Sequence, residues 1–86
     1  DKAIERFQRI LRIDSTHIDM YVYLGDTYLS MGEKQKAIES YENYKIRVKD
    51  TLVSKDIDEY IKKLKQSEAA KILAIIQTEL SLINRK

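Results

Sequence analysis

The chain has 86 residues, of which 43% are hydrophobic and 35% charged, with two glycines, no proline and no cysteine. This length allows one domain or part of one, and the lack of cysteine excludes disulfides, thiolate zinc sites and cysteine nucleophiles. The 16 basic and 14 acidic side chains are interspersed and give a net charge of +2, which is typical of a solvated surface and not of a nucleic-acid footprint. We expect an all-α protein, because the chain has no proline and few glycines to form the turns between strands.

No stretch approaches the ~20 consecutive apolar residues of a membrane-spanning helix, and the N-terminus DKAIERF lacks the apolar core of a signal peptide. The lack of cysteine fits a reducing compartment and so favours a cytoplasmic location. Because the chain does not begin with methionine, we expect it to be a piece of a longer protein.

The first predicted helix spans residues 2–13. Its apolar residues recur at the spacing of one face of an amphipathic helix, and they are Ala3, Ile4, Phe7, Ile10 and Leu11.

The second predicted helix spans residues 17–31. Thr16 and Asp19 stand at the spacing of a capping box, in which each side chain accepts a hydrogen bond from the backbone N–H of the other residue. The apolar stripe that follows consists of Ile18, Tyr21, Leu24, Gly25, Tyr28 and Leu29. Gly32 suits the left-handed conformation that commonly follows a helix end, so we expect a tight turn there.

The third predicted helix spans residues 34–48 and repeats the first. The sequence KAIERF, which starts at residue 2, recurs as KAIESY at residue 36, 34 positions later. The matched positions keep their small, aliphatic and aromatic classes, with Ala37, Ile38 and Tyr41 in the second copy. The sequence therefore contains an internal repeat.

Beyond residue 50 the pattern predicts a fourth helix that starts at a Ser54 cap and carries Ile57, Tyr60, Ile61 and Leu64 on one face. A second cap at Ser67 would start a fifth helix, the most hydrophobic in the chain, with apolar residues Ala69, Ile72, Leu73, Ile76, Leu80 and Ile83. No glycine or proline marks that break, so residues 54–84 form either two helices or one long bent helix. We expect the apolar face of the last segment to pack against the preceding repeat rather than on a membrane or a partner.

These features resemble the tetratricopeptide repeat, a unit of 34 residues that folds as two antiparallel helices. The resemblance covers residues 1 to about 51 and rests on signature classes met at Ala3, Phe7, Tyr21, Leu24, Gly25, Tyr28, Gly32, Ala37 and Tyr41. It divides the chain into the second half of a unit at 1–17, a complete unit at 18–51, and a degenerate unit or C-terminal capping helix pair at 52–86. It also implies that Tyr21, Tyr28 and Tyr41 lie in the core.

The resemblance implies a superhelical solenoid fragment of about five antiparallel helices and a non-enzymatic scaffold for protein–protein interaction. The concave surface of the family maps to one face of the second helix, our predicted peptide-binding site: Asp19, Val22, Tyr23, Asp26, Leu29 and Ser30. Members that clamp a terminal carboxylate carry lysine, asparagine or arginine where this chain has Val22 and Asp26, so we expect a basic or apolar peptide instead. The alternative is a capping or homo-oligomerisation module with no external ligand.

The resemblance also implies a reason for Gly25 inside a helix, where glycine costs about 1 kcal/mol relative to alanine. We expect Gly25 to face the small Ala37, so that the two helix backbones approach closely. The family partner of the first helix is absent, so its apolar stripe is expected to be uncovered. Either a longer protein supplies the partner helix, or the chain self-associates through this stripe.

No residue pattern indicates a catalytic residue, a cofactor or a metal site. His17 is the one histidine and is expected at the surface or near a helix start. Asp56, Asp58 and Glu59 lack the loop and glycine of a calcium site, so we expect a solvated helix start. The lysines of the second half are diluted by acidic neighbours, which argues against nucleic-acid or membrane binding; they are Lys49, Lys55, Lys62, Lys63, Lys65 and Lys71.

Overall fold

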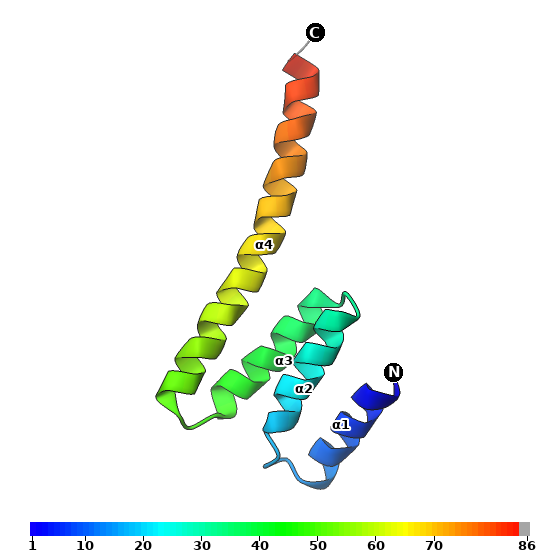
Figure 1. Ribbon diagram of the computed structural model, residues 1–86, viewed down its shortest axis with the longest axis vertical. Coiled ribbons are helices and arrows are strands. Elements are labelled where there is room, and N and C mark those ends of the chain that lie inside the picture. The colour runs from blue at the N-terminus through cyan, green and yellow to red at the C-terminus, as the bar shows by residue number, and fades with distance from the viewer. Residues whose placement is uncertain (85–86) are drawn as a thin grey trace.

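The computed structural model describes residues 1–84, apart from the side chains of residues 68–70, and contains four helices and no strand in that part of the chain. The helices are α1 (Lys2–Ile13), α2 (Asp19–Ser30), α3 (Lys34–Arg47) and α4 (Thr51–Asn84). They pack in chain order, α1 on α2, α2 on α3, and α3 on the first half of α4 (Figure 1). The all-α prediction is confirmed.

Of the two alternatives for residues 54–84, the structure has one long helix and not two. The cap of α4 is Asp50, whose Oδ1 accepts hydrogen bonds from the backbone N–H groups of Leu52 and Val53 at 2.9 and 3.3 Å. The predicted cap at Ser54 is therefore wrong, because an earlier carboxylate satisfies the free donors of the first turn. Ser67 lies inside the helix and starts no new one. At 34 residues, α4 extends beyond the other helices and gives the molecule a longest dimension of 61 Å (Figure 1).

The start of α2 also differs from the prediction. The capping box between Thr16 and Asp19 is not formed, and α2 begins at Asp19 with no side-chain cap. Instead, Oδ1 of Asp14 accepts hydrogen bonds from the backbone N–H of Thr16 at 3.0 Å and from its hydroxyl at 2.5 Å. These bonds hold the pKa of the Asp14 carboxyl below its usual value, and they order the loop between α1 and α2.

The turn between α2 and α3 follows the prediction. Gly32 has φ +79°, a conformation that other residues adopt only under strain. The backbone N–H of Glu33 donates to the carbonyl of Tyr28 at 2.8 Å, and the N–H of Gly32 donates to that of Leu29 at 3.1 Å. This pair of bonds is the Schellman motif, which satisfies the last carbonyls of α2 and fixes the antiparallel hairpin.

The core is centred on α3. Its buried cluster consists of Ala37, Ile38 and Tyr41 from α3 and Ile61 from α4. Half-buried side chains of α2 and α4 pack against this cluster, namely Val22, Tyr28, Leu29, Ile57 and Leu64. Beyond it, Leu24 and Ile4 are buried where α1 packs on α2. The hydrophobic effect therefore holds the first half of α4 to α3 much as it holds α2.

Of the three tyrosines expected in the core, Tyr41 is buried and the other two are only half-buried. A cation covers each of those two rings. The guanidinium of Arg47 lies 4.8 Å from the ring centroid of Tyr21, and the ammonium of Lys36 lies 5.7 Å from that of Tyr28. Since both cations belong to α3, these cation–π contacts tie the two helices together at the surface.

Gly25 allows a close approach between α2 and α3, but its neighbour is not the predicted one. A Cβ atom on Gly25 would lie 2.5 Å from Cε1 of Tyr41 and 2.7 Å from its Cζ, closer than real Cβ contacts come. The nearest atoms thus belong to Tyr41 and not to Ala37, one turn earlier on the same face of α3. The glycine makes room for an aromatic ring that is only 1% exposed.

The end of α4 contradicts the prediction that it would pack on the repeat. Two ion pairs join α3 to the first half of this helix, Lys45 to Asp58 at 3.0 Å and Glu42 to Lys65 at 3.2 Å. Beyond them, every residue of the segment 71–84, here called the α4 tail, is exposed. The side chain of Ala69, which was expected on the same apolar face, lies outside the described residues. The tail projects from the helical body instead of covering it (Figure 1).

Candidate functional site

The predicted peptide-binding residues lie along one side of α2. Asp19, Asp26 and Ser30 are exposed, and the ring of Tyr23 is 46% exposed. The two aliphatic members of the set, Val22 and Leu29, are half-buried, because they also pack against the core cluster. The face therefore combines apolar surface with two carboxylates, as the sequence predicted, but part of each aliphatic side chain is already covered.

Asp26 has a structural partner that the sequence did not reveal. The hydroxyl of Tyr41 donates a hydrogen bond to Oδ1 of Asp26 at 2.5 Å and so connects α3 to α2. Burial raises the pKa of the Tyr41 hydroxyl, and the neighbouring carboxylate raises it further. The Asp26 carboxylate thus helps to hold the core ring in place. Asp26 nevertheless remains exposed at the surface of α2.

Tyr23 has a partner in α1. The centroids of the Phe7 and Tyr23 rings are 5.6 Å apart, with the planes tilted by 36°. This contact helps α2 to cover the apolar stripe of α1, whereas Ile13, which lies outside that stripe, is 79% exposed. The stripe expected to be uncovered is therefore partly covered: Ile4 is buried, and Ala3, Phe7, Ile10 and Leu11 are half-buried.

The first half of α4 adds residues to this face that were not in the predicted site. The rings of Tyr41 and Tyr60 meet edge to face with centroids 5.4 Å apart, and Tyr60 remains 40% exposed. Tyr41 therefore contacts α2 through its hydroxyl and α4 through its ring edge. We define the α2–α4 face as the predicted set on α2 together with Ile57, Tyr60 and Leu64. The periodicity of residues 57–64 contained this signal, because Tyr60 falls beside the apolar stripe.

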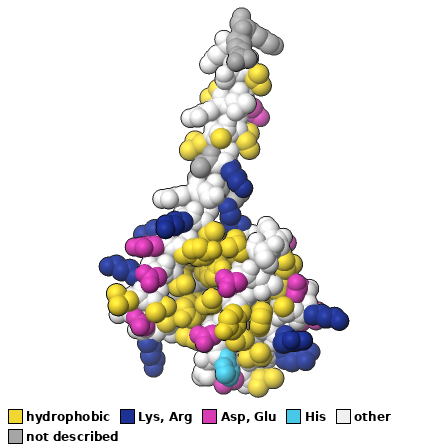
Figure 2. Space-filling view, in the orientation of Figure 1, with side chains coloured by type: hydrophobic (Ala, Val, Ile, Leu, Met, Phe, Trp, Pro, Cys, Tyr) yellow, Lys and Arg dark blue, Asp and Glu magenta, His cyan; other side chains and the backbone are white. Residues whose placement is uncertain are grey.

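The charge distribution on this side of the molecule is uneven. Figure 2 shows hydrophobic side chains gathered over the middle of the helical body, with acidic side chains among and around them. Basic side chains lie mainly toward the outer edges of the helical body in this view. Carboxylates beside an apolar surface attract cationic groups and disfavour anionic ones.

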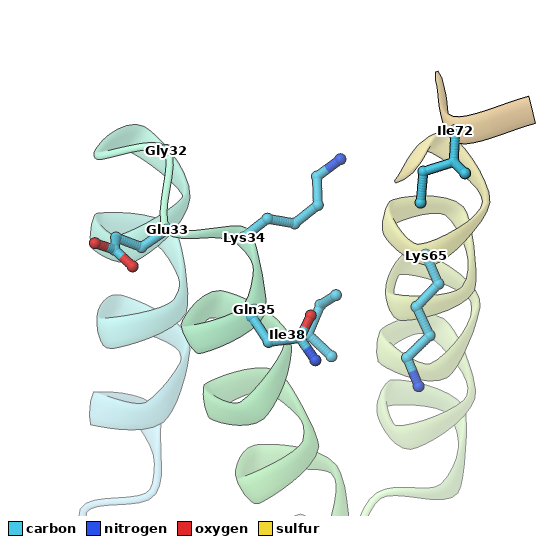
Figure 3. A pocket seen from close by; sticks show the side chains of 7 residues that line it. All are labelled: Gly32, Glu33, Lys34, Gln35, Ile38, Lys65 and Ile72. Carbon is cyan, nitrogen blue, oxygen red and sulfur yellow. The ribbon is translucent and has the colours of Figure 1, made fainter. Parts of the chain in front are cut away.

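A separate cleft of about 620 Å³ lies where α4 leaves the helical body. It is lined by Gly32, Glu33, Lys34, Gln35, Ile38, Lys65 and Ile72, which come from the α2–α3 turn, the start of α3 and the middle of α4. Figure 3 shows the side chain of Lys34 directed toward α4 and that of Glu33 directed away from it. The carboxylate of Glu33 thus does not point into the cleft.

His17 and the acidic residues of α4 form no reactive cluster. Nε2 of His17 lies 3.5 Å from Oδ2 of Asp14, and both side chains are about half exposed. Asp58 is held between Lys45 and Lys62, whose hydrogen bonds keep the pKa of its carboxyl below the usual value. Among the described residues, no group of three histidine, aspartate or glutamate side chains is placed to bind a metal ion.

Comparisons with protein-family models, with curated proteins and with solved structures find no match to this chain. In the part of the chain that the structure describes, none of the helices combines the length and hydropathy needed to cross a membrane. Inference about function therefore depends on the geometry of the α2–α4 face and of the α4 tail.

Proposed function

We propose that the chain is a fragment of a tetratricopeptide-like scaffold and that its α2–α4 face binds a basic, amphipathic segment of a partner protein. The observation that carries this proposal is the exposure of two tyrosines, Tyr23 on α2 and Tyr60 on α4, with the exposed carboxylate of Asp19 one turn before Tyr23 on the same helix. Aromatic side chains anchor many interfaces, because they offer a large contact area at a low cost in side-chain entropy.

The rigidity of the face supports the same proposal. Tyr41 contacts both Asp26 of α2 and Tyr60 of α4, so one buried ring bridges the two helices. A preformed surface loses little conformational entropy when a ligand binds, which leaves more of the contact energy for affinity. The 34-residue repeat and the Schellman turn at Gly32 support the family assignment, in which paired helices present such a surface.

The test uses a fluorescent amphipathic peptide of leucine and lysine, and its leucine–glutamate counterpart as a probe of opposite charge. The basic peptide is expected to bind and the acidic peptide to fail, because the face carries carboxylates. Asp19→Lys and Tyr23→Ala are each expected to weaken binding by about tenfold, equivalent to ~1.4 kcal/mol. Asp26 is unsuitable for this test, because its replacement would also remove the hydrogen-bond partner of Tyr41.

Glu39→Lys serves as the matched control, since Glu39 is an exposed carboxylate on α3 outside the α2–α4 face. It makes the same change in net charge as Asp19→Lys and is expected to leave affinity within about twofold. Equal losses for the two variants would show that binding follows net charge and not this face. Absence of binding by the basic peptide at ~1 mM would contradict the proposed function.

A further inference from the structure

The α4 tail exposes a long apolar surface away from the α2–α4 face. All of its leucines and isoleucines are between 46% and 65% exposed, namely Ile72, Leu73, Ile75, Ile76, Leu80, Leu82 and Ile83. Its only charged residues are Lys71 and Glu79. Soluble monomers rarely expose a contiguous apolar patch of this kind, so the tail is a candidate interaction surface.

The spacing of four of these residues matches a coiled-coil seam. Leu73, Ile76, Leu80 and Ile83 follow one another at intervals of three, four and three residues, which places leucine at the a positions and isoleucine at the d positions of a heptad. All four side chains lie on one side of the helix, because residues three and four apart are neighbours on its surface. None of the four is covered by the helical body.

We propose that the α4 tail binds the α4 tail of a second copy of this chain, with the two helices antiparallel. In this register Leu73 packs against Ile83 of the other copy and Ile76 against Leu80, so every layer pairs one leucine with one isoleucine. A parallel pair would stack leucine on leucine and isoleucine on isoleucine, and leucine at a with isoleucine at d disfavours two parallel strands. The antiparallel pair also places the two helical bodies at opposite ends of the joined tails.

The size of the surface sets the expected strength. A tail of this length gives about 20 Å of helix contact at 1.5 Å per residue. That contact is smaller than the roughly 800 Å² per partner of a standard stable interface, so we expect the pair to be weak. No charged residue lies in the seam itself, which is bordered by Gln77 and Asn84 on one side and by Ile72 and Glu79 on the other. A second copy fits this surface, because an uncharged, self-complementary seam needs no partner of opposite charge.

Sedimentation equilibrium from ~5 µM to ~1 mM tests whether the pair forms. The wild-type chain is expected to shift from monomer to dimer, and Leu80→Glu is expected to remain monomeric throughout. Ser81→Glu is the matched control, because it adds the same charge on the polar side of the helix and keeps the seam intact. Both positions are exposed, so equal helical circular dichroism should accompany the difference. A wild-type monomer at ~1 mM, or loss of the dimer in Ser81→Glu, would overturn the proposal.

Cysteine cross-linking tests the orientation, and the cysteine-free sequence makes it direct. Ile76→Cys and Leu80→Cys variants are oxidised separately and as a mixture. In the antiparallel register, a disulfide is expected in the mixture, between position 76 of one copy and position 80 of the other, and not within either variant alone, because bridged Cβ atoms must be about 3.8 Å apart. Cross-linking of each variant with itself would indicate a parallel pair and refute the proposed orientation.

Discussion

The α2–α3 hairpin and the α4 tail are both amphipathic helix, but only the hairpin is specified by contacts between distant residues. In the hairpin, the ring of Tyr41 fits against Gly25, its hydroxyl bonds Asp26, and the positive φ of Gly32 sets the turn. The tail has the same helical period and no covering element. The difference shows that an apolar stripe predicts a helix reliably but does not predict what, if anything, covers it.

The largest expected effect that tests this comparison comes from Gly25→Leu. The new side chain would have to displace the ring of Tyr41, which is buried and cannot move aside at low cost. Overpacking typically costs about 1–3 kcal/mol, and because the displaced ring is in the core we expect the free energy of unfolding to fall by about 3 kcal/mol. Chemical denaturation followed by circular dichroism measures this. A melting temperature equal to that of the wild type would contradict the close packing at this point.

The next effect is the pH dependence that Tyr41 confers. Its pKa is raised by burial and by Asp26, so the neutral phenol is the form that the folded state holds. The contribution of Tyr41 to the free energy of unfolding is therefore fully present below the ordinary tyrosine pKa of about 10. Above that pH the unfolded state loses the proton and the folded state keeps it, so the free energy of unfolding falls by ~1.4 kcal/mol per pH unit for this one group. Urea denaturation at pH 8, 10 and 11 measures this slope. Tyr41→Phe is the control, and an equally steep slope in that variant would assign the effect to other groups.

A smaller loss is expected for Tyr41→Phe itself at pH 7. The substitution keeps the ring against Gly25 and Tyr60 and removes only the hydroxyl that donates to Asp26. Hydrogen bonds to charged groups contribute roughly 1.5–3 kcal/mol, and Asp26 is exposed enough for water to replace the lost donor, so we expect ~1 kcal/mol. Urea denaturation at constant salt measures it. Tyr23→Phe, at a half-exposed ring, should change stability by less than half as much.

Sequence reasoning predicted the local features of the hairpin well and the long-range ones poorly. The span of α1, the ends of α2 and α3 to within two residues and the turn at Gly32 all follow from periodicity and glycine chemistry. The bond from Tyr41 to Asp26 joins residues 15 positions apart, and no spacing rule connects them. For the same reason the ring that faces Gly25 was misassigned to Ala37.

The start of α4 and the candidate site show a second limit of prediction from the sequence. Asp50 and Ser54 are both good caps, and which one is used depends on where the chain leaves α3, a tertiary property. The α2 residues of the site follow from the resemblance to tetratricopeptide repeats. The contribution of Tyr60 was missed because it depends on α4 packing beside Tyr41.

The smallest expected effect is that of Ile75→Ala in the α4 tail, and we compare it with the same substitution at Ile61 in the first half of α4. Ile75→Ala removes a side chain that is 60% exposed, and alanine is the better helix former, so stability should change by less than about 0.5 kcal/mol in dilute solution. Ile61→Ala removes a side chain that is 2% exposed in the core cluster and should cost about 2–5 kcal/mol. Thermal and urea denaturation of both variants at ~2 µM gives the two losses in the free energy of unfolding. At this low concentration the weak pairing proposed for the tail is not expected to contribute. Similar losses at the two positions would mean that the tail folds back onto the body in solution, and the contrast between hairpin and tail would then be wrong.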